Sequence, residues 1–270
     1  MASFDIATAY ADKARFAEAC RDVCGKERQA GGIGTLSEKT LHAVIKKFIE
    51  PDERFHEVSV SGSIADVKNA EGIFEVQTRA FNKLRGKLRR FLAEGPVTVV
   101  YPIPAEKRLI WVDAGTGAVS APRKSPKKGR SYDAIDELYK LDRLIAQEGL
   151  RILLLFIDMD EYRILGGGGS AGKRRSTRYE RIPEGLSGAL LLCDGKDYAE
   201  RFLPPALPVQ FTSRDLAASA RISQRLAQTT LTVLTKRGAV GCVGKSGRLN
   251  LYEVLSAGPT PARKESLCKP

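Results

Sequence analysis

The feature of the sequence that most constrains the fold is a pair of short apolar runs in the middle of the chain. Val97–Ile103 and Arg151–Ile157 are rich in consecutive aliphatic residues, which predicts strands buried inside a sheet. Residues 37–49 and 81–92 carry apolar positions at helical spacing, so amphipathic helices are available to cover such a sheet. The sequence therefore predicts an α/β domain with a mixed sheet.

Further short strands and helices are predicted around these two runs. The segments 56–60, 64–67 and 73–77 predict three strands separated by turn residues. The order from Ser37, which suits a helix N-cap, is thus helix, three strands, helix and strand. Later elements are predicted as a hairpin around Gly115–Gly117, a basic loop at 121–131, a helix at Tyr132–Gln147, and a strand at Leu186–Leu192. Residues 166–185, which are glycine-rich, then basic and then turn-like, are predicted as a loop.

We expect four regions along the chain. An N-terminal helical extension covers residues 1–35, and an α/β domain with basic loops covers residues 36–206. Residues 207–257 form a second module, in which helices are followed by a hairpin. Residues 258–270 form a disordered tail.

Length and composition exclude several classes of protein. The longest apolar run, Ile152–Ile157, is far shorter than the roughly 20 residues that a membrane helix needs. The N-terminus lacks the pattern of a signal peptide, and five scattered cysteines do not indicate a disulfide framework. We therefore expect a cytoplasmic protein without a membrane partner.

The positive charge of the chain, +12 overall, is concentrated in two segments. Residues 79–130 contain 13 basic and three acidic side chains, and residues 163–181 contain six basic side chains and one acidic one. Clustered Lys and Arg residues neutralise phosphates and release counterions. This distribution favours a polyanion as partner, although a solvated surface would carry the same pattern.

Two carboxylates are predicted to lie side by side on neighbouring strands. Asp66 and Glu75 are nine residues apart at the ends of adjacent predicted strands, and Gln77 follows Glu75 on the same face of the sheet. Adjacent carboxylates repel each other unless a cation lies between them. Oxygen ligands of this kind suit Mg²⁺, or Mn²⁺ in its place, which can activate water for phosphodiester hydrolysis.

The segment from residue 36 to 104 resembles the PD-(D/E)XK nuclease superfamily. The residues that carry the resemblance are Gly62-Ser-Ile-Ala-Asp66 and Ile73-Phe-Glu75-Val-Gln77, set in an αβββαβ order. The resemblance implies a restriction-endonuclease-like fold and makes Asp66 and Glu75 metal ligands. It puts Gln77 where the superfamily usually has Lys, so this residue can orient water by hydrogen bonds but supplies no charge. It also suggests an acidic residue on the first helix, for which Glu38 is the better candidate, with Glu57 on the first strand as the second choice.

In the second module the sequence predicts a short helix after Thr212, a second helix at Ser223–Arg237 stopped by Gly238, and a hairpin with a basic tip. This order resembles a winged helix-turn-helix over about residues 209–256. In such folds the second helix enters the major groove of DNA. A small helical module that packs on the first domain or joins two chains would give the same pattern.

The candidate DNA-binding residues come from the basic segments and from this module. They are Arg79, Lys83, Arg85, Arg89, Lys127, Lys128, Arg174, Arg175, Gln224, Arg225, Gln228, Lys245 and Arg248. These side chains can contact phosphates or base edges. The basic helix that follows Gln77 would bring a phosphodiester to the carboxylate pair.

The hypothesis that follows is a Mg²⁺-dependent deoxyribonuclease, an endonuclease acting on double-stranded DNA. The alternative is a non-catalytic, regulatory DNA-binding protein whose nuclease-like domain has lost its chemistry, and RNA stays open as a substrate. Palindromic cutting would require a homodimer. Gly167–Lys173 fits a phosphate-binding loop, but Arg174 stands where such loops have Ser or Thr, so nucleotide hydrolysis is disfavoured.

Overall fold

The computed structural model describes residues 10–29, 40–165 and 176–255 of the chain. The chain divides into two compact units, Met1–Leu192 and Cys193–Pro270. The sequence suggests a division after residue 206, whereas the observed division assigns the helix at Gly195–Phe202 to the second unit.

The first unit is a mixed sheet with helices, and from residue 40 to residue 103 its elements follow the order that the sequence predicts. Its helical elements are α2 (Lys13–Gln29), α3 (Thr40–Ile49), η1 (Glu53–Phe55), η2 (Phe81–Leu84), α4 (Arg85–Leu92), η3 (Ser131–Ala134), α5 (Ile135–Tyr139) and η4 (Asp142–Ala146). Its strands are β1 (His56–Val60), β2 (Ser63–Asn69), β3 (Gly72–Val76), β4 (Val97–Asp113), β5 (Arg123–Lys124), β6 (Leu150–Leu165) and β7 (Ser176–Leu192).

The strand order is β1-β2-β3-β4-β6-β7, with β5 paired to β4. Strands β1, β2 and β3 form an antiparallel meander, and β3, β4 and β6 run parallel to one another. The last strand, β7, is antiparallel to β6. The prediction of a mixed α/β sheet is confirmed, and the two apolar runs form its central parallel strands.

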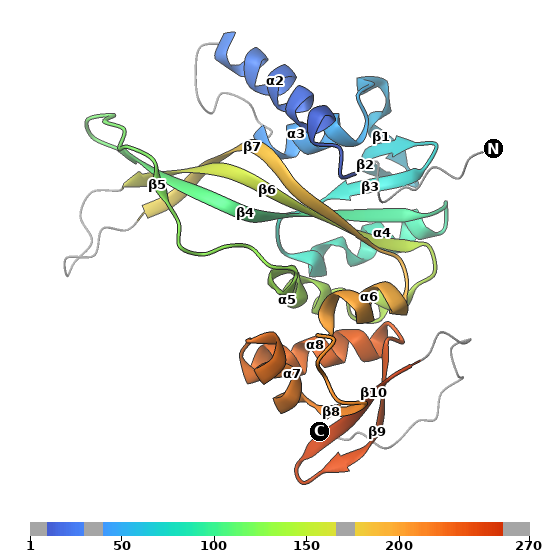
Figure 1. The fold of residues 1–270 in the computed structure, drawn as a ribbon. Helices are drawn as coiled ribbons and strands as arrows, with labels where there is room; N and C mark the ends of the chain where they lie inside the picture. The colour runs from blue at the N-terminus through green and yellow to red at the C-terminus, as the bar shows by residue number, and fades with distance from the viewer. Residues whose placement is uncertain (1–9, 30–39, 166–175, 256–270) are drawn as a thin grey trace. The chain divides into compact units, whose positions relative to one another are not determined.

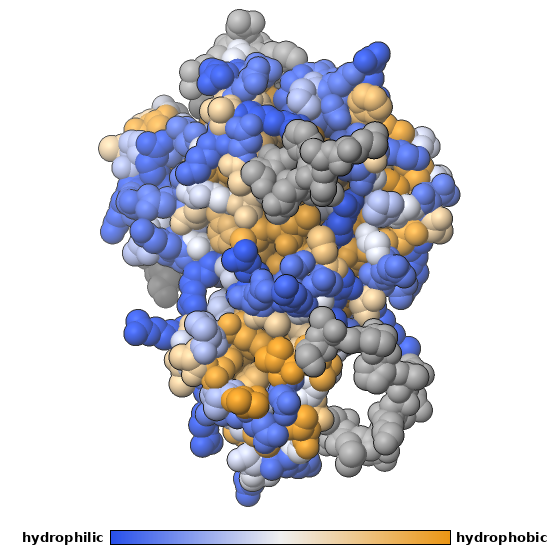
Figure 2. Space-filling view, turned by 45° about the vertical axis from the view of Figure 1, so that its right-hand side comes forward, coloured by the Kyte–Doolittle hydropathy of each residue, from blue (hydrophilic) through white to orange (hydrophobic). Residues whose placement is uncertain are grey.

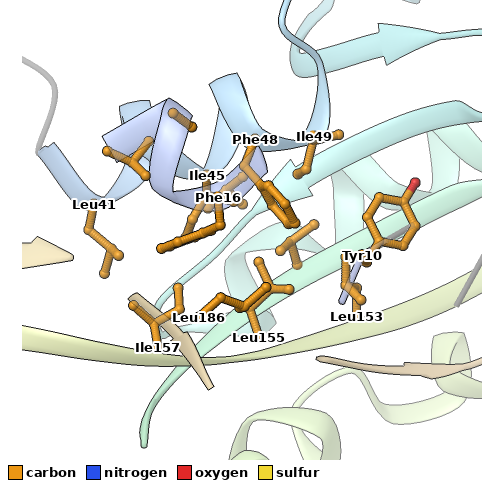
Figure 3. Close-up of a cluster of buried hydrophobic side chains, with 14 of the residues drawn as sticks. Tyr10, Phe16, Leu41, Ile45, Phe48, Ile49, Leu153, Leu155, Ile157 and Leu186 are labelled. Atoms are coloured by element: carbon orange, nitrogen blue, oxygen red, sulfur yellow. The ribbon is translucent and has the colours of Figure 1, made fainter. Parts of the chain in front are cut away.

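Helices cover both faces of this sheet, with α2 and α3 on one side and α4 and α5 on the other (Figure 1). The core under α2 and α3 joins Phe16 and Phe48 of the helices to Leu153, Leu155 and Ile157 of β6 (Figure 3). Because alternate residues of a strand face opposite sides, the buried Ile152 and Leu154 lie on the other face of the sheet. The continuous apolar run of β6 is thus explained by burial on both sides.

The turn between β2 and β3 sets the register of the meander. The Asn69 side chain accepts a hydrogen bond from the backbone N–H of Glu71 at 3.0 Å, which is a local turn contact. Gly72 follows with φ +124, and a Cβ at this position would collide with the backbone oxygen of Pro96. Only glycine fits here without strain, so the turn holds the ends of β2 and β3 in place.

Several predicted elements differ from the structure in the first unit. Residues 97–103 and 108–112 are parts of one long strand, β4, since its pairing with β6 continues beyond the irregularity at Pro104/Lys107. The helix predicted at Tyr132–Gln147 is broken into η3, α5 and η4, and Asp142 at the second break has φ +57. Residues 176–181, for which the sequence predicts a loop, form the start of β7 because they pair with β6.

The N-terminal helix is part of the first unit rather than an appendage to it. Tyr10, Phe16 and Ala19 are buried in the core shared with α3 and the sheet. The rings of Phe16 and Phe48 meet edge to face with centroids 5.2 Å apart. The predicted helical extension therefore contributes to the stability of the sheet domain.

In its described residues, 193–255, the second unit forms α6 (Gly195–Phe202), α7 (Ser213–Ala220), α8 (Gln224–Lys236) and a three-stranded sheet. The strands are β8 (Gln210–Thr212), β9 (Val240–Ser246) and β10 (Leu249–Val254), in the order β8-β10-β9. Thr212 and Ser223 accept backbone hydrogen bonds as the N-caps of α7 and α8, and Gly238 follows α8 with φ +75. The predicted helix limits and hairpin are confirmed.

The polarity of the surface and the lengths of the helices can be compared with what a membrane-spanning protein requires. The face seen in Figure 2 is mostly hydrophilic, with hydrophobic patches on both units. Among the described residues, no helix combines the length and apolar character needed to cross a membrane.

The core beneath α2 and α3 gives a first testable prediction. Phe48 is 1% exposed, so Phe48→Ala leaves a cavity and should lower the free energy of unfolding by roughly 3–5 kcal/mol. The matched control is Phe55→Ala, because Phe55 is 42% exposed and should cost less than about 1 kcal/mol. Urea unfolding followed by circular dichroism measures both. Equal losses in the two variants would contradict the assignment of the core.

Candidate functional site

The structure brings Asp66 of β2 and Glu75 of β3 together. The backbone N–H of Val76 donates to Asp66 Oδ2 at 2.7 Å, and the backbone N–H of Asp66 lies 3.3 Å from Glu75 Oε1. Each carboxylate therefore contacts the backbone of the strand that carries the other. This arrangement agrees with the sequence-based prediction that the two side chains meet.

A lysine from helix α4 accompanies Glu75. The Glu75 residue is 2% exposed, and Lys87 Nζ lies 2.7 Å from each of its carboxylate oxygens. The ammonium group also lies 5.4 Å from the ring centroid of Phe91, one turn farther along α4. Lys87 is not among the predicted site residues. A usable signal exists in the sequence, because Lys87 shares a helix face with the buried Leu84 and Phe91.

The two carboxylates have opposite pKa shifts. Burial, together with the negative charge of Asp66, raises the pKa of Glu75 to about 7, against the opposing effect of Lys87. Burial acts on Asp66 in the same direction, but contacts with His42, the N–H of Val76 and the charge of Lys87 lower its pKa overall. Asp66 is therefore the charged member of the pair at neutral pH, while Glu75 is close to its titration point.

His42 of helix α3 lies beside Asp66. Its Nε2 is 3.2 Å from Asp66 Oδ2, an ion-pair distance when the imidazole is protonated. Its neighbour Leu41 and the following Val44 and Ile45 are buried in the core, which holds this part of α3 against the sheet. His42 is one of two histidines in the chain, but no sequence pattern links it to Asp66.

Asp66 and His42 line a pocket of about 920 Å³ in the first unit. Residues from α3, β1, β2, the end of β3 and the start of β7 line it; they are Leu41, His42, Glu57, Asp66, Val76, Gln77, Thr78, Arg79, Ser176, Thr177, Arg178, Tyr179, Glu180 and Arg181. Glu75 lies behind this lining, next to Lys87. The pocket thus has an acidic wall around Asp66, while β7 contributes the arginines Arg178 and Arg181 together with the carboxylate of Glu180.

Gln77 lines the pocket, but its amide is engaged within the chain. The side-chain Nε2 donates to the backbone oxygen of Arg79 at 2.5 Å, and the backbone N–H donates to Val100 at 2.9 Å. This contact fixes the amide nitrogen, whereas the amide oxygen is an acceptor that could hold a water. Glu57, the second acidic candidate, also lines the pocket and pairs with Lys46 at 3.0 Å.

The predicted DNA-binding residues of the first unit lie in different surroundings. Lys83 and Arg89 are exposed near and on α4, and Arg79 lines the pocket. Arg85 donates to the backbone oxygen of Lys140 at 2.6 Å. Lys127 pairs with Asp133 at 3.0 Å, and Lys128 pairs with Glu106 at 3.2 Å. Three predicted candidates, Glu38, Arg174 and Arg175, lie outside the described residues.

The predicted residues of the second unit lie on α8 and the hairpin. Gln224 is the first residue of α8, and its amide donates to Ser213 Oγ at 2.7 Å. Arg225 and Gln228 are exposed on the same helix, and Lys245 and Arg248 flank the turn between β9 and β10. The buried face of α8 is formed by Ala227, Leu231 and Leu234, so the polar residues point away from the unit's core.

The carboxylate pair can be tested for its fit to a metal ion. Within the ranges described above, no group of three or more His, Cys, Asp or Glu side chains is arranged to hold a metal. Mg²⁺, however, often takes only one or two protein carboxylates and completes its shell with water and phosphate oxygens. The negative charge of Asp66 contributes to the raised pKa of Glu75, and an ion between the two carboxylates would offset this repulsion, so the pair fits such an ion, although Lys87 already balances Glu75.

Comparison with known proteins places this sheet domain in a family. The chain belongs to the family described as "Domain of unknown function (DUF8091)", which matches residues 39–192. The matched segment contains Asp66, Glu75, Lys87 and every residue that lines the pocket.

One relative is an "Uncharacterized protein" of Treponema pallidum (strain Nichols). It is 32% identical over 133 residues, which cover 49% of this chain and 53% of the relative. The match thus spans about half the length of each protein. No solved structure matches the chain significantly.

The raised pKa of Glu75 predicts a specific dependence of stability on pH. The pKa of about 7 in the folded protein lies above the ordinary value of 4.5, so the native state holds an extra proton between these values. The stabilisation from this proton is complete below pH 4.5 and is lost as the pH rises through 7. Glu75→Gln should therefore reduce the fall in unfolding free energy between pH 5 and 8 by about 1–3 kcal/mol.

Denaturant unfolding at several pH values measures this difference. The control Glu148→Gln removes an exposed carboxylate and should keep the slope of the wild-type protein. Parallel pH profiles for the wild type and Glu75→Gln would show that Glu75 does not titrate in this range.

Proposed function

We propose that the protein is a metal-dependent DNA endonuclease with an appended DNA-binding module. The observation that carries the proposal is the pairing of Asp66 and Glu75 on adjacent strands, with Lys87 beside Glu75. Paired carboxylates and a lysine are the groups that phosphodiester hydrolysis with Mg²⁺ or Mn²⁺ uses. In this proposal Asp66 and Glu75 are the metal ligands.

The topology of the sheet domain supports the resemblance to PD-(D/E)XK nucleases. The helix α3, the meander β1-β2-β3, the helix α4 and the strand β4 follow one another in the αβββαβ order. Strand β4 pairs in parallel with β3, and Asp66 and Glu75 lie on the second and third strands. Fold likeness alone does not define an activity, so the argument for chemistry rests on the side chains.

Lys87 offers the positive charge that Gln77 lacks. A bound metal ion would supply an activated water and stabilise the charge that develops on the phosphate. Lys87 holds the Glu75 carboxylate at 2.7 Å and could lend its charge to the same region. His42 orients Asp66 through Oδ2, and the amide oxygen of Gln77 can accept a hydrogen bond from water.

The second unit supports a role in DNA binding. Its helices α7 and α8 and the sheet order β8-β10-β9 agree with the winged helix-turn-helix that the sequence resembles. Arg225, Gln228, Thr232 and Thr235 recur at helical spacing on the exposed side of α8. A polar stripe of this kind suits the major groove, and Lys245 and Arg248 would contact phosphates from the hairpin.

The second candidate is a DNA-binding protein without catalysis. Two observations favour it: the Gln77 amide is engaged with the backbone of Arg79, and Lys87 already neutralises Glu75. If Lys87 does not release Glu75, a divalent cation has a single carboxylate to bind. The presence or absence of metal-dependent cleavage separates the two functions.

A plasmid-nicking assay tests the catalytic proposal. With Mg²⁺ or Mn²⁺ the wild-type protein should nick supercoiled DNA, while Asp66→Asn and Glu75→Gln should lower the rate by at least about 100-fold. Lys87→Gln should also slow cleavage by about 10-fold or more, because the charge beside Glu75 is removed. Duplex DNA in competition with structured RNA identifies the preferred nucleic acid.

The controls for this assay are Lys68→Gln and Glu148→Gln. Both residues are exposed and lie outside the pocket, so these variants should nick DNA as the wild type does. Cleavage that persists in Asp66→Asn and Glu75→Gln would refute the assigned site. Binding without cleavage under every metal condition would favour the second candidate.

DNA binding by the second unit is tested separately. Replacement of Arg225 and Lys245 by Gln should weaken binding to a 20-base-pair duplex. It should also lower the slope of log affinity against log salt, by about 1 for each phosphate that the protein no longer neutralises. Arg201→Gln, an exposed change on α6 with the same change of charge per residue, is the control. Fluorescence anisotropy over a range of salt concentrations gives the slopes, and unchanged slopes would exclude α8 and the hairpin as the DNA-binding surface.

A further inference from the structure

A buried glutamate in β6 gathers four basic side chains around it. Glu161 is 0% exposed and forms ion pairs with Lys107 of β4, Arg163 of β6, and Arg178 and Arg181 of β7. These residues come from three neighbouring strands, so the cluster is built on the sheet rather than on loops.

The contacts in this cluster are unequal. Arg163 takes Glu161 Oε1, with Nε at 2.8 Å and Nη2 at 2.7 Å. The other oxygen, Oε2, is shared by Lys107 at 3.3 Å, Arg178 Nε at 3.3 Å and Arg181 Nε at 3.2 Å. One carboxylate oxygen therefore holds three cationic groups at the long end of ion-pair distance.

Positive charge exceeds negative charge at this place. Glu180 is a further carboxylate in this region, and its Oε1 accepts the backbone N–H of Arg181 at 3.1 Å. Burial lowers the pKa of Lys107 and of Arg181, and neighbouring arginines lower both further. Burial acts to raise the pKa of Glu161, but the surrounding cations hold it at about 2. The cluster keeps its carboxylate charged and still has an unneutralised positive charge.

Two members of the cluster face the pocket that contains Asp66. Arg178 and Arg181 line this pocket, as do Asp66, His42 and Arg79. Within the described residues, Glu161 is the carboxylate with which each of these two arginines forms an ion pair, and each makes the contact through Nε. A guanidinium group carries further donors on its terminal nitrogens, and a second acceptor in the pocket could engage them.

We propose that Arg178 and Arg181 form a phosphate-binding subsite, with Glu161 as the positioning residue that holds both guanidinium groups against the pocket. The ligand is a phosphate of the nucleic-acid backbone, held in the pocket that Asp66 also lines. This inference rests on the proposed function, because it names the part of the substrate that the pocket receives.

The chemistry of the cluster fits a phosphate ligand. A phosphodiester shares one negative charge between two non-bridging oxygens, and two guanidinium groups can each donate several hydrogen bonds to them. The pocket volume of about 920 Å³ is large enough for a nucleotide and its neighbouring phosphates. An anion here would offset the repulsion among Lys107, Arg178 and Arg181.

Inorganic phosphate is the first probe of this subsite. In a thermal-shift titration of the full chain, phosphate should raise the melting temperature of the wild type above that in chloride of equal ionic strength. Arg178→Gln should lose this stabilisation. The variant should still fold, because the Arg178 side chain is 44% exposed. Arg181→Gln is the second variant, and Arg143→Gln, an exposed change of equal charge on η4, is the control.

A 20-base-pair duplex is the second probe, used without divalent metal. Arg178→Gln combined with Arg181→Gln should weaken binding about 10-fold at fixed salt and lower the salt slope by about 1, while Arg143→Gln changes neither. Arg178→Lys should keep most of the slope of log affinity against log salt, since the charge remains. It should bind the duplex less tightly, because lysine lacks the planar set of N–H donors that a guanidinium group presents.

The two probes separate this proposal from the nuclease assignment. Equal phosphate stabilisation and equal salt slopes in the wild type, both arginine variants and Arg143→Gln would overturn the subsite, even if the wild type nicks DNA. Phosphate stabilisation that disappears in Arg178→Gln supports the subsite, even if no metal condition yields nicking and the nuclease assignment fails.

Discussion

The ion pair between Glu75 and Lys87 is the interaction on which the rest of the site depends. A carboxylate as deeply buried as Glu75 is costly to keep charged without a partner, and breaking such a pair typically costs about 3–5 kcal/mol. Because Glu75 belongs to β3 and Lys87 to α4, the pair fixes the rotation of the helix over the sheet. The same contact leaves Asp66 as the charged group that faces the pocket.

Helix α3 and strand β7 contribute to different parts of the pocket. Burial of Leu41 and Phe48 anchors α3, and this holds His42 beside Asp66. The long pairing of β6 with β7 carries Glu161 to the register position of Arg181. The acidic wall therefore depends on helix packing, whereas the basic wall depends on strand register. A disturbance of one wall need not displace the other.

The sequence predicts some of this site and misses the rest for physical reasons. Asp66 and Glu75 could be paired because a tight turn between two short strands leaves little freedom in their register. Lys87 escapes prediction because its partner depends on how α4 rotates, although a lysine in the apolar stripe of Leu84 and Phe91 is a usable signal. Arg178 and Arg181 resemble loop residues in the sequence, since a glycine-rich segment precedes them and their pairing partner lies in β6. Long-range pairing of this kind has no local signature in the chain.

The difference between a catalytic and a binding role comes down to competition at Glu75. With a pKa of about 7, this carboxylate is poised between its neutral and charged forms, and Lys87 favours the charged form. A second cation near Asp66 would favour it further and would weaken the hold of Lys87 on either oxygen. In the proposed nuclease, Lys87 would then be repelled from the proposed metal ligands but kept close by its attachment to α4, and its charge would be available to a phosphate. Gln77 need not supply that charge, so the glutamine that the resemblance puts at the usual lysine position is compatible with the proposed catalysis when α4 provides the cation.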